Sequence, residues 1–336
     1  MVRLQVQLWT ILILICTTGS AGFAASPVPQ LEKILVSNFN NSKVLQFSPT
    51  GTLLGVFGQA DSSTGISTAG SLIVDQQGRV YVSSISTGKV LRYTRNGQFL
   101  GTFATTPGGF FRGLDFDSGG GLYLRQGAVS SNNILRFDSS GNLASNFITF
   151  VEGQGDIAID GSGVLYVPLD QPFSATNDGI VRMTTTGTSL GVFGQANNAQ
   201  SGVNSPESAA FDANGNLYVA SAGNVLRYNA AGTYLGVFAT GVAKNLEFDA
   251  AGNLYGTDGS EEAVLKYDSN GNFVGKLLTA GSGGLPANFL PEGITFIYQV
   301  PEPSCAALAA MAGGLVAIFW LLDRRCQDRA PSRVPS

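Results

Sequence analysis

The sequence contains no histidine, and its three cysteines, Cys16, Cys305 and Cys326, all lie near its ends. Histidine is the residue that proteins use most for general acid–base catalysis near neutral pH and for binding metal ions. Because residues 17–304 contain no cysteine, this part of the chain cannot rely on disulfides, and packing must stabilise it. Catalysis or metal binding here would have to use other groups, carboxylates above all.

Charged residues are also scarce, at 12% of the chain. Between residues 26 and 300 there are 14 Lys and Arg against 20 Asp and Glu, a net charge of 14 − 20 = −6. A negative domain is not drawn to nucleic acid or to anionic lipid, so neither is expected as a partner. The abundance of Gly, Ser, Thr and Asn is typical of an extracellular β protein.

The first 25 residues have the pattern of a secretory signal peptide. A basic residue, Arg3, precedes an apolar run from Leu8 to Cys16, and small residues follow up to Ala24 and Ala25. The apolar run is too short to span a membrane comfortably, so we expect cleavage after one of the two alanines. An uncleaved anchor is the alternative. A lipid attached to Cys16 is disfavoured because Ile15, before it, is not small.

Residues 300–336 form a second segment outside the predicted domain. Two prolines, Pro301 and Pro303, flank Glu302, and an apolar run over 306–322 follows, before Arg324 and Arg325. A run of this length just suffices for a membrane helix, and the two arginines would hold its end in the cytoplasm. The order of these features resembles a PEP-CTERM sorting tail. The resemblance implies processing by an exosortase and delivery to the cell surface or the exopolysaccharide matrix. One departure is that residues 326–336 continue past the basic pair.

Between the two ends the chain repeats. The clearest mark is a short apolar strand with a basic or amide residue at its third position, beginning at Val44, Val90, Ile134, Ile180, Val225 and Val264. The steps between these marks are 46, 44, 46, 45 and 39 residues. Each copy reads as four strands, and two of the turns have an Asp- or Asn-x-x-Gly pattern that suits a type I turn. Four strands in a period of about forty residues indicate the blade of a β-propeller.

The incomplete copies at the two ends of the repeat region predict the topology. The first copy starts at the second strand (34–36), and the last copy contains only an opening strand (293–296). If these fragments pair, they complete one blade and close a ring without an exposed edge. We therefore predict an all-β, six-bladed propeller of four-stranded antiparallel blades over residues 26–299. A seven-bladed ring or another all-β stack is the alternative.

The repeat also resembles the NHL repeat and its SMP-30-like and streptogramin-lyase-like relatives. The motifs that carry this resemblance are Pro-Glu-Gly-Ile-Thr-Phe at 291–296 and Asp-Ala-Asn-Gly-Asn-Leu-Tyr-Val at 212–219. The resemblance implies the propeller fold, but propellers host many unrelated functions. The lyases of this group rely on histidine, which this chain lacks. The SMP-30-like hydrolases bind a divalent ion through Glu, Asn and Asp, so a Ca²⁺ or Mg²⁺ site made of carboxylates remains an alternative to having no cofactor.

The residues just before each opening strand should surround one mouth of the central channel. Alignment of the copies places four charged residues there, namely Arg112, Glu207, Lys244 and Glu292, with Asp156 and Asn245 beside them. These four residues are the predicted ligand-binding set. The alternative is that the two glutamates only pair with the two basic residues across the mouth. The loops at 38–42, 127–132 and 168–178 are further candidates, because loops often carry recognition.

Three other repeated features have simpler explanations than ligand binding. The repeated aspartates open Asp-x-x-Gly turns, and the repeated tyrosines fall at core positions. The basic residues at the third strands belong to separate blades and do not form one patch. We predict a non-catalytic binding or structural module, with matrix polysaccharide or surface proteins as partners. A divalent-metal-dependent hydrolase or lyase is the alternative.

Overall fold

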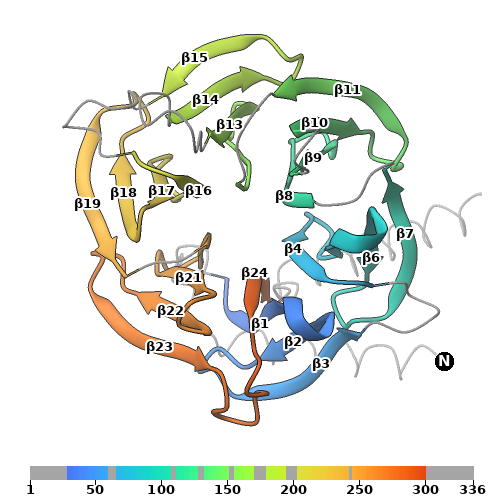
Figure 1. The fold of residues 1–336 in the computed structure, drawn as a ribbon, viewed down its shortest axis with the longest axis vertical. Helices are drawn as coiled ribbons and strands as arrows, with labels where there is room; N and C mark the ends of the chain where they lie inside the picture. The colour runs from blue at the N-terminus through green and yellow to red at the C-terminus, as the bar shows by residue number, and fades with distance from the viewer. Residues whose placement is uncertain are drawn as a thin grey trace, which may run out of the picture. The chain divides into compact units, whose positions relative to one another are not determined.

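The computed structural model describes residues 29–59, 66–106, 111–127, 132–150, 155–169, 179–193, 203–241 and 244–299. These residues form an all-β propeller of six four-stranded antiparallel blades arranged in a ring (Figure 1). Residues Gln30–Gln299 make up this compact unit. The predicted signal peptide, the sorting motif Pro301–Pro303 with Arg324 and Arg325, and the apolar run 306–322 lie outside the described residues. Within the described ranges, no helix is both long enough and apolar enough to cross a membrane.

Each blade runs from an inner strand at the channel to an outer strand at the circumference (Figure 1). In that order, blades 1 to 3 consist of β24 (Pro291–Tyr298), β1 (Leu31–Asn38), β2 (Lys43–Phe47) and β3 (Leu53–Gln59); β4 (Ala69–Val74), β5 (Val80–Ser84), β6 (Lys89–Tyr93) and β7 (Phe99–Thr105); and β8 (Phe111–Phe116), β9 (Leu122–Gln126), β10 (Asn132–Phe137) and β11 (Leu143–Phe150).

Blades 4 to 6 follow the same order and consist of β12 (Ala158–Ile159), β13 (Val164–Leu169), β14 (Gly179–Thr184) and β15 (Ser189–Phe193); β16 (Pro206–Phe211), β17 (Leu217–Ser221), β18 (Asn224–Tyr228) and β19 (Tyr234–Thr240); and β20 (Asn245–Phe248), β21 (Leu254–Asp258), β22 (Ala263–Tyr267) and β23 (Phe273–Thr279). Short 3₁₀ turns, η1 (Phe39–Asn41) and η2 (Ile85–Thr87), link the second and third strands of blades 1 and 2.

The last strand of the chain closes the ring. β24 pairs antiparallel with β1, with Thr295 opposite Leu35 and Phe296 opposite Ile34. Blade 1 is therefore built from both ends of the repeat region, which confirms the predicted closure and the count of six blades. Since the unit pairs its own two ends, residues 26–299 contain every strand that the ring requires.

The turns between strands follow the predicted chemistry. In the turn after β16, the backbone N–H of Gly215 donates to the carbonyl of Asp212 at 3.0 Å, and Gly215 has a φ of +76°. Asp212 Oδ1 accepts from the backbone N–H groups of Asn214 and Asn216, both at 2.9 Å. The carboxylate thus satisfies the turn and Gly supplies the left-handed backbone.

The core lies between the blades. Phenylalanines of the opening strands pack edge-on against tyrosines of the preceding blade: Phe248 against Tyr218, with ring centroids 4.7 Å apart, and Phe296 against Tyr255, at 4.9 Å. Tyr255 is fully buried and Tyr218 is 3% exposed. Edge-to-face pairs of this kind add to the free energy gained from burying the rings. Neighbouring blades are therefore held together by repeated aromatic contacts, as predicted for the core tyrosines.

Candidate functional site

The four predicted mouth residues lie at the beginnings of the opening strands. Arg112 is the second residue of β8, Glu207 the second of β16 and Glu292 the second of β24, while Lys244 directly precedes β20. The strand ladders are irregular at these points, and Arg112 and Glu207 each fall in a register shift. Such bulges redirect side chains away from the regular face of a sheet. The side chain of Arg112 is outside the described part of the structure.

The structure brings two of the four into one pocket. Glu207 and Lys244 line a cavity of about 230 Å³ between blades 5 and 6, together with Ser205, Ser221, Asp258 and Ser260. Glu292 does not line it, and its backbone carbonyl accepts a hydrogen bond from Thr257 Oγ1 at 3.1 Å. Within the described ranges, neither Lys244 nor Glu292 forms an ion pair. The alternative in which Lys244 pairs with a glutamate across the mouth is therefore not found there. We call this cavity the mouth pocket.

The central channel holds a second group of polar residues that the sequence analysis missed in part. Asp115, Asp156 and Glu247 line a cavity of about 320 Å³ inside the ring. Asp115 and Glu247 occupy the middle of their opening strands, where other copies have Ile73, Ala158, Ala210 or Thr295. A carboxylate at a position that is apolar in most other copies was the sequence signal that could have revealed this channel group. The sequence analysis read these strands by their apolar pattern alone and named only Asp156.

Asp156 connects three blades at the mouth end of this channel. Its Oδ2 accepts from Asn245 Nδ2 of blade 6 at 2.7 Å, and its backbone N–H donates to the carbonyl of Glu207 of blade 5 at 2.8 Å. Gly113 of blade 3 leaves room for it, because a Cβ at Gly113 would lie 2.4 Å from Asp156 Oδ1. Asp156 and Asn245 thus form a hydrogen-bonded bridge across the channel.

Burial raises the pKa of all three channel carboxyls. The pKa of Asp115 and of Asp156 rises to about 7, mainly by burial, although Asp115 accepts backbone hydrogen bonds from Phe116 and Ile159. Burial, together with the charges of Asp115 and Asp156, raises the pKa of Glu247 to about 8. Near neutral pH the channel therefore holds protonated and ionised carboxyls side by side. Such a group can exchange protons with a ligand, or can both donate and accept hydrogen bonds.

The described residues do not provide the divalent-ion site that the family resemblance implies. None of their His, Cys, Asp and Glu side chains come together in groups of three or more that could hold a metal ion. In the channel, Asp115 accepts a hydrogen bond from Ile159 N, and Asp156 accepts one from Asn245 Nδ2. A Ca²⁺ ion takes six to eight oxygen ligands, more than these side chains bring together.

The other repeated side chains have structural roles, as predicted. The turn aspartates Asp75, Asp117, Asp160, Asp212 and Asp249 each accept backbone hydrogen bonds within their own turns. The third-strand basic residues stack on aromatic rings of their own blades; the Arg227 guanidinium, for example, lies 5.9 Å from the Phe238 ring centroid. Of the candidate loops, η1 covers 39–41, whereas 128–131 and 170–178 lie outside the described residues.

Several solved structures share the fold. A chain of the nidogen/laminin complex matches with a TM-score of 0.62 and 18% identity, over 79% of this chain and 97% of that chain. A protein of unknown function from Bacteroides caccae matches with a TM-score of 0.58 and 16% identity, over 80% and 99%. A streptogramin B lyase matches with a TM-score of 0.55 and 13% identity, over 80% and 90%. The common element is the propeller.

At these identities the similarity establishes the fold and nothing more. The matching propellers include one from a binding complex and one from an enzyme, so the fold does not separate these two functions. No protein-family model matches the sequence, and no curated protein is similar to it. Function must therefore be argued from the residues of this chain.

Proposed function

We propose that the chain is an exported propeller, held at the cell surface or in the exopolysaccharide matrix, that binds a polyhydroxylated ligand without catalysis at the mouth of its channel. The observation that carries this proposal is the mouth pocket, in which Glu207 and Lys244 lie among serine hydroxyls. An ammonium group donates hydrogen bonds and a carboxylate accepts them. A sugar unit, whose hydroxyls do both, matches this pairing better than an anion or a cation alone.

The size and position of the mouth pocket agree with this ligand class. Its volume of about 230 Å³ suits one sugar residue of a longer chain. The pocket lies where the opening strands begin, close to Asp156 and Asn245, so a bound sugar would reach the edge of the channel. Asp258, at the pocket wall, uses its Oδ1 in its own turn, where it accepts from Ser260 N at 2.8 Å. Glu207 and Lys244 are the charged contacts that we assign to the ligand.

The cellular setting of the proposal rests on the two ends of the sequence. The signal-like segment 1–25 supports export. Pro301, Glu302, Pro303 and the basic pair Arg324 and Arg325 support handling by an exosortase-type enzyme, with the apolar run 306–322 as a membrane anchor before processing. A partner of the mouth would then be a matrix polysaccharide or a surface protein that carries sugar. Matrix polysaccharide is the simpler partner for a pocket of this size.

Monosaccharide binding to residues 26–299 tests the proposal. We expect saturation-transfer NMR with a panel of neutral, amino and uronic monosaccharides to detect at least one ligand. Glu207→Gln and Lys244→Gln should each weaken it by about tenfold, the effect of losing a hydrogen bond to a charged group. Lys276→Gln, on the outer strand β23, is the matched control and should leave binding unchanged. Absence of any ligand, or equal effects of all three substitutions, would refute the mouth as a binding site.

One observation favours a second candidate, a hydrolase or lyase. The channel carboxyls with pKa values near neutrality could act as general acid and base. Screening of lactone and ester substrates, with and without Ca²⁺ or Mg²⁺, separates the two functions. Turnover that Asp115→Asn or Glu247→Gln abolishes would replace the binding proposal with this one.

A further inference from the structure

A large cavity near the channel lies on the face opposite the mouth. It has a volume of about 700 Å³ and is lined by the Asp-x-x-Gly turns that follow the opening strands of blades 2, 3 and 4. We call it the turn-face groove. Asp115 lines both the groove and the channel cavity, so the two spaces meet at this residue. The opening strands separate the groove from the mouth pocket, and the two sites share no lining residue.

The groove exists because the turns facing each other differ in side-chain size. Blade 2 has Asp-Gln-Gln-Gly-Arg at 75–79, with Gln76 and Gln77 exposed. Blade 3 has Asp-Ser-Gly-Gly-Gly at 117–121, which removes side chains from the opposite wall. Gly161 likewise leaves the wall of blade 4 without a side chain at that position, and a Cβ placed there would meet nothing within 4 Å. One wall therefore carries long polar side chains, whereas the others expose backbone.

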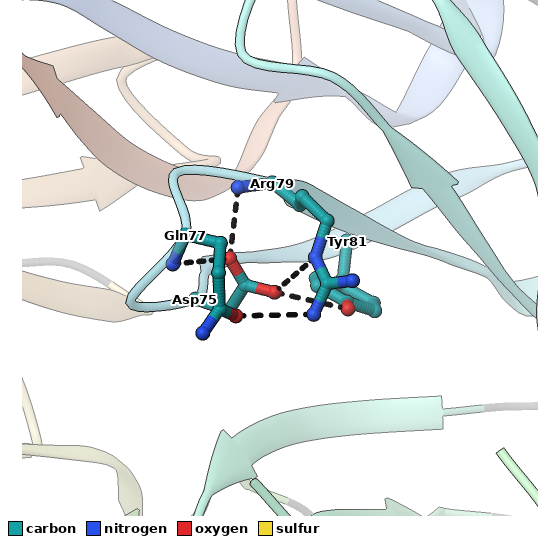
Figure 2. Close-up of polar contacts among 4 residues, drawn as sticks. All are labelled: Asp75, Gln77, Arg79 and Tyr81. Atoms are coloured by element: carbon teal, nitrogen blue, oxygen red, sulfur yellow. Dashed lines mark hydrogen bonds and ion pairs between the residues drawn. The ribbon is translucent and has the colours of Figure 1, made fainter. Parts of the chain in front are cut away.

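Arg79 departs from the repeat at this groove. In blades 5 and 6 the same position is Asn216 or Asn253, whose side-chain amide donates to the turn aspartate at 2.8 Å. Arg79 takes over this role with Nε, which donates to Asp75 Oδ2 at 2.6 Å, and its Nη2 donates to Gln77 Oε1 at 3.1 Å (Figure 2). Tyr81 also donates to Asp75 Oδ2, at 3.1 Å.

This network holds the guanidinium in place without using all of its donors. Among the described residues, Nη1 of Arg79 makes no hydrogen bond, and the side-chain amide nitrogen of Gln77 also has none. Figure 2 shows Arg79, Gln77 and Asp75 gathered on one side of the turn. A fixed side chain loses little further entropy when a ligand binds. The groove therefore presents a set of oriented, uncommitted donors.

The basic side chains at the groove are paired, and negative charge is in excess, because Asp160 also lines the groove and forms no ion pair with the described residues. Asp75 pairs with Arg79, and Asp117 pairs with Arg136 at 3.3 Å. The uncommitted groups include neutral ones, such as the amide of Gln76 and the hydroxyls of Ser118 and Ser139. An acidic chain would meet no excess of positive charge here. The rings at the groove, Tyr81 and Phe103, are 1% and 7% exposed, so they offer little surface to an apolar peptide side chain.

We propose that the turn-face groove binds a neutral polysaccharide chain, through Arg79, Gln76 and Gln77 on one wall and the glycine-rich backbone of blades 3 and 4 on the other. A long polar groove with amide, guanidinium and hydroxyl groups matches a ligand whose surface is made of hydroxyls. The inference is independent of the mouth proposal, because it concerns other residues on the other face. With both sites occupied, one molecule would join two polysaccharide chains.

Native affinity electrophoresis of residues 26–299 tests the groove, with dextran, galactomannan, laminarin or the acidic alginate in the gel. We expect at least one neutral polysaccharide to retard the protein. Arg79→Asn removes the guanidinium but keeps a side-chain donor to Asp75, because Asn at this position donates to the turn aspartate in blades 5 and 6. Gly119 holds the turn position that Gln77 holds in blade 2, so Gly119→Gln places a long side chain in the groove. Each should raise the apparent Kd by about tenfold.

The matched control is Ala251→Gln, the same turn position in blade 6, which should bind as the unsubstituted protein does. Glu207→Gln should also leave retardation unchanged, so failure of the mouth proposal is distinguishable from failure of this one. Melting temperatures check that each variant is folded. Three results would overturn the inference: no retardation by any neutral polysaccharide, retardation by alginate alone, or retardation that Arg79→Asn and Gly119→Gln do not reduce. If selection from a peptide library yields peptides that the Gly119→Gln variant no longer binds, and no glycan binds, the groove is a protein-binding site and the inference is also wrong.

Discussion

At the scale of single residues, burial penalises the charged forms of the channel carboxyls. Asp115 and Glu247 also sit at a position where other opening strands have mostly apolar residues. Asp115 and Asp156 each accept two hydrogen bonds that offset part of this penalty. Among the described residues, Glu247 has no hydrogen-bond donor, and burial raises its pKa to about 8. Groups that are retained despite such a penalty are candidates for function.

Glu247→Gln should make the propeller more stable at high pH. The pKa of Glu247 rises from 4.5 to about 8 on folding. Between these values the folded state keeps a proton that the unfolded state releases, so the stability that this group contributes falls as pH rises and levels off above about 8. Gln has no charge to lose, so we expect a gain of about 4 kcal/mol in the free energy of unfolding at pH 8 and none at pH 4.

Thermal unfolding of residues 26–299 at pH 4, 6 and 8 measures this effect. Glu261→Gln, at an exposed position, is the matched control and should change stability little at any of the three values. A gain for Glu247→Gln that did not grow with pH would show that the carboxyl ionises as readily in the folded channel as in the unfolded chain, and that burial does not raise its pKa.

At the scale of elements, the repeated turn does more than its sequence pattern predicts. The pattern correctly assigned Asp249 to a turn, where its Oδ1 accepts from Ala251 N and Asn253 N. In addition, Oδ2 accepts from the Tyr255 hydroxyl at 3.1 Å and from the Asn253 amide at 2.8 Å. The aspartate thus ties the turn to the buried tyrosine that packs against the next blade. The six-residue spacing from Asp to Tyr recurs in several copies and was the signal for this contact.

Asp249→Ala should therefore destabilise the propeller more than an equivalent turn substitution does. It would leave the turn amides and the Tyr255 hydroxyl without their acceptor, and we expect a loss of about 3 kcal/mol. Asp268→Ala is the matched control: Asp268 opens the same kind of turn between β22 and β23 but is bonded only to its exposed turn. Its loss should be clearly smaller, because only exposed turn groups lose their acceptor. Urea denaturation followed by circular dichroism compares them, and equal losses would mean that the tyrosine contact contributes nothing.

The elements also show why the fold could be predicted and the sites only in part. Strand periodicity and turn chemistry are local, so residues such as Val225 or Gly215 revealed the blade and its repeat directly. The mouth pocket depends on which repeats become neighbours, and the ring brought Glu207 to Lys244 but not to Glu292. The turn-face groove combines long side chains of blade 2, such as Gln77, with glycines of blades 3 and 4, Gly119 and Gly161. These residues belong to different repeats, so no single repeat shows the pattern.

At the scale of the whole molecule, the ring is one closed structure, in which each blade packs on two neighbours. The contact between blades 6 and 1 is made by β24, the last strand, yet it repeats the contact between blades 5 and 6. Phe296 packs on Tyr255 as Phe248 packs on Tyr218, with centroid distances of 4.9 and 4.7 Å. The seam where the chain's ends meet is thus built like the interior of the chain.

This equivalence predicts that the seam unfolds with the rest of the ring. Phe296→Ala should cost about 3 kcal/mol, as should Phe248→Ala, because each removes a ring from between two blades. Both variants should unfold in one transition, since losing β24 exposes the edge of β1 and the apolar side chains beneath it. Urea denaturation followed by circular dichroism, with hydrogen exchange of the β1 amides, measures both quantities. A second, earlier transition in Phe296→Ala, with the β1 amides exchanging before those of β17, would show instead that β24 opens as a separate flap and that the ring is stable without closure.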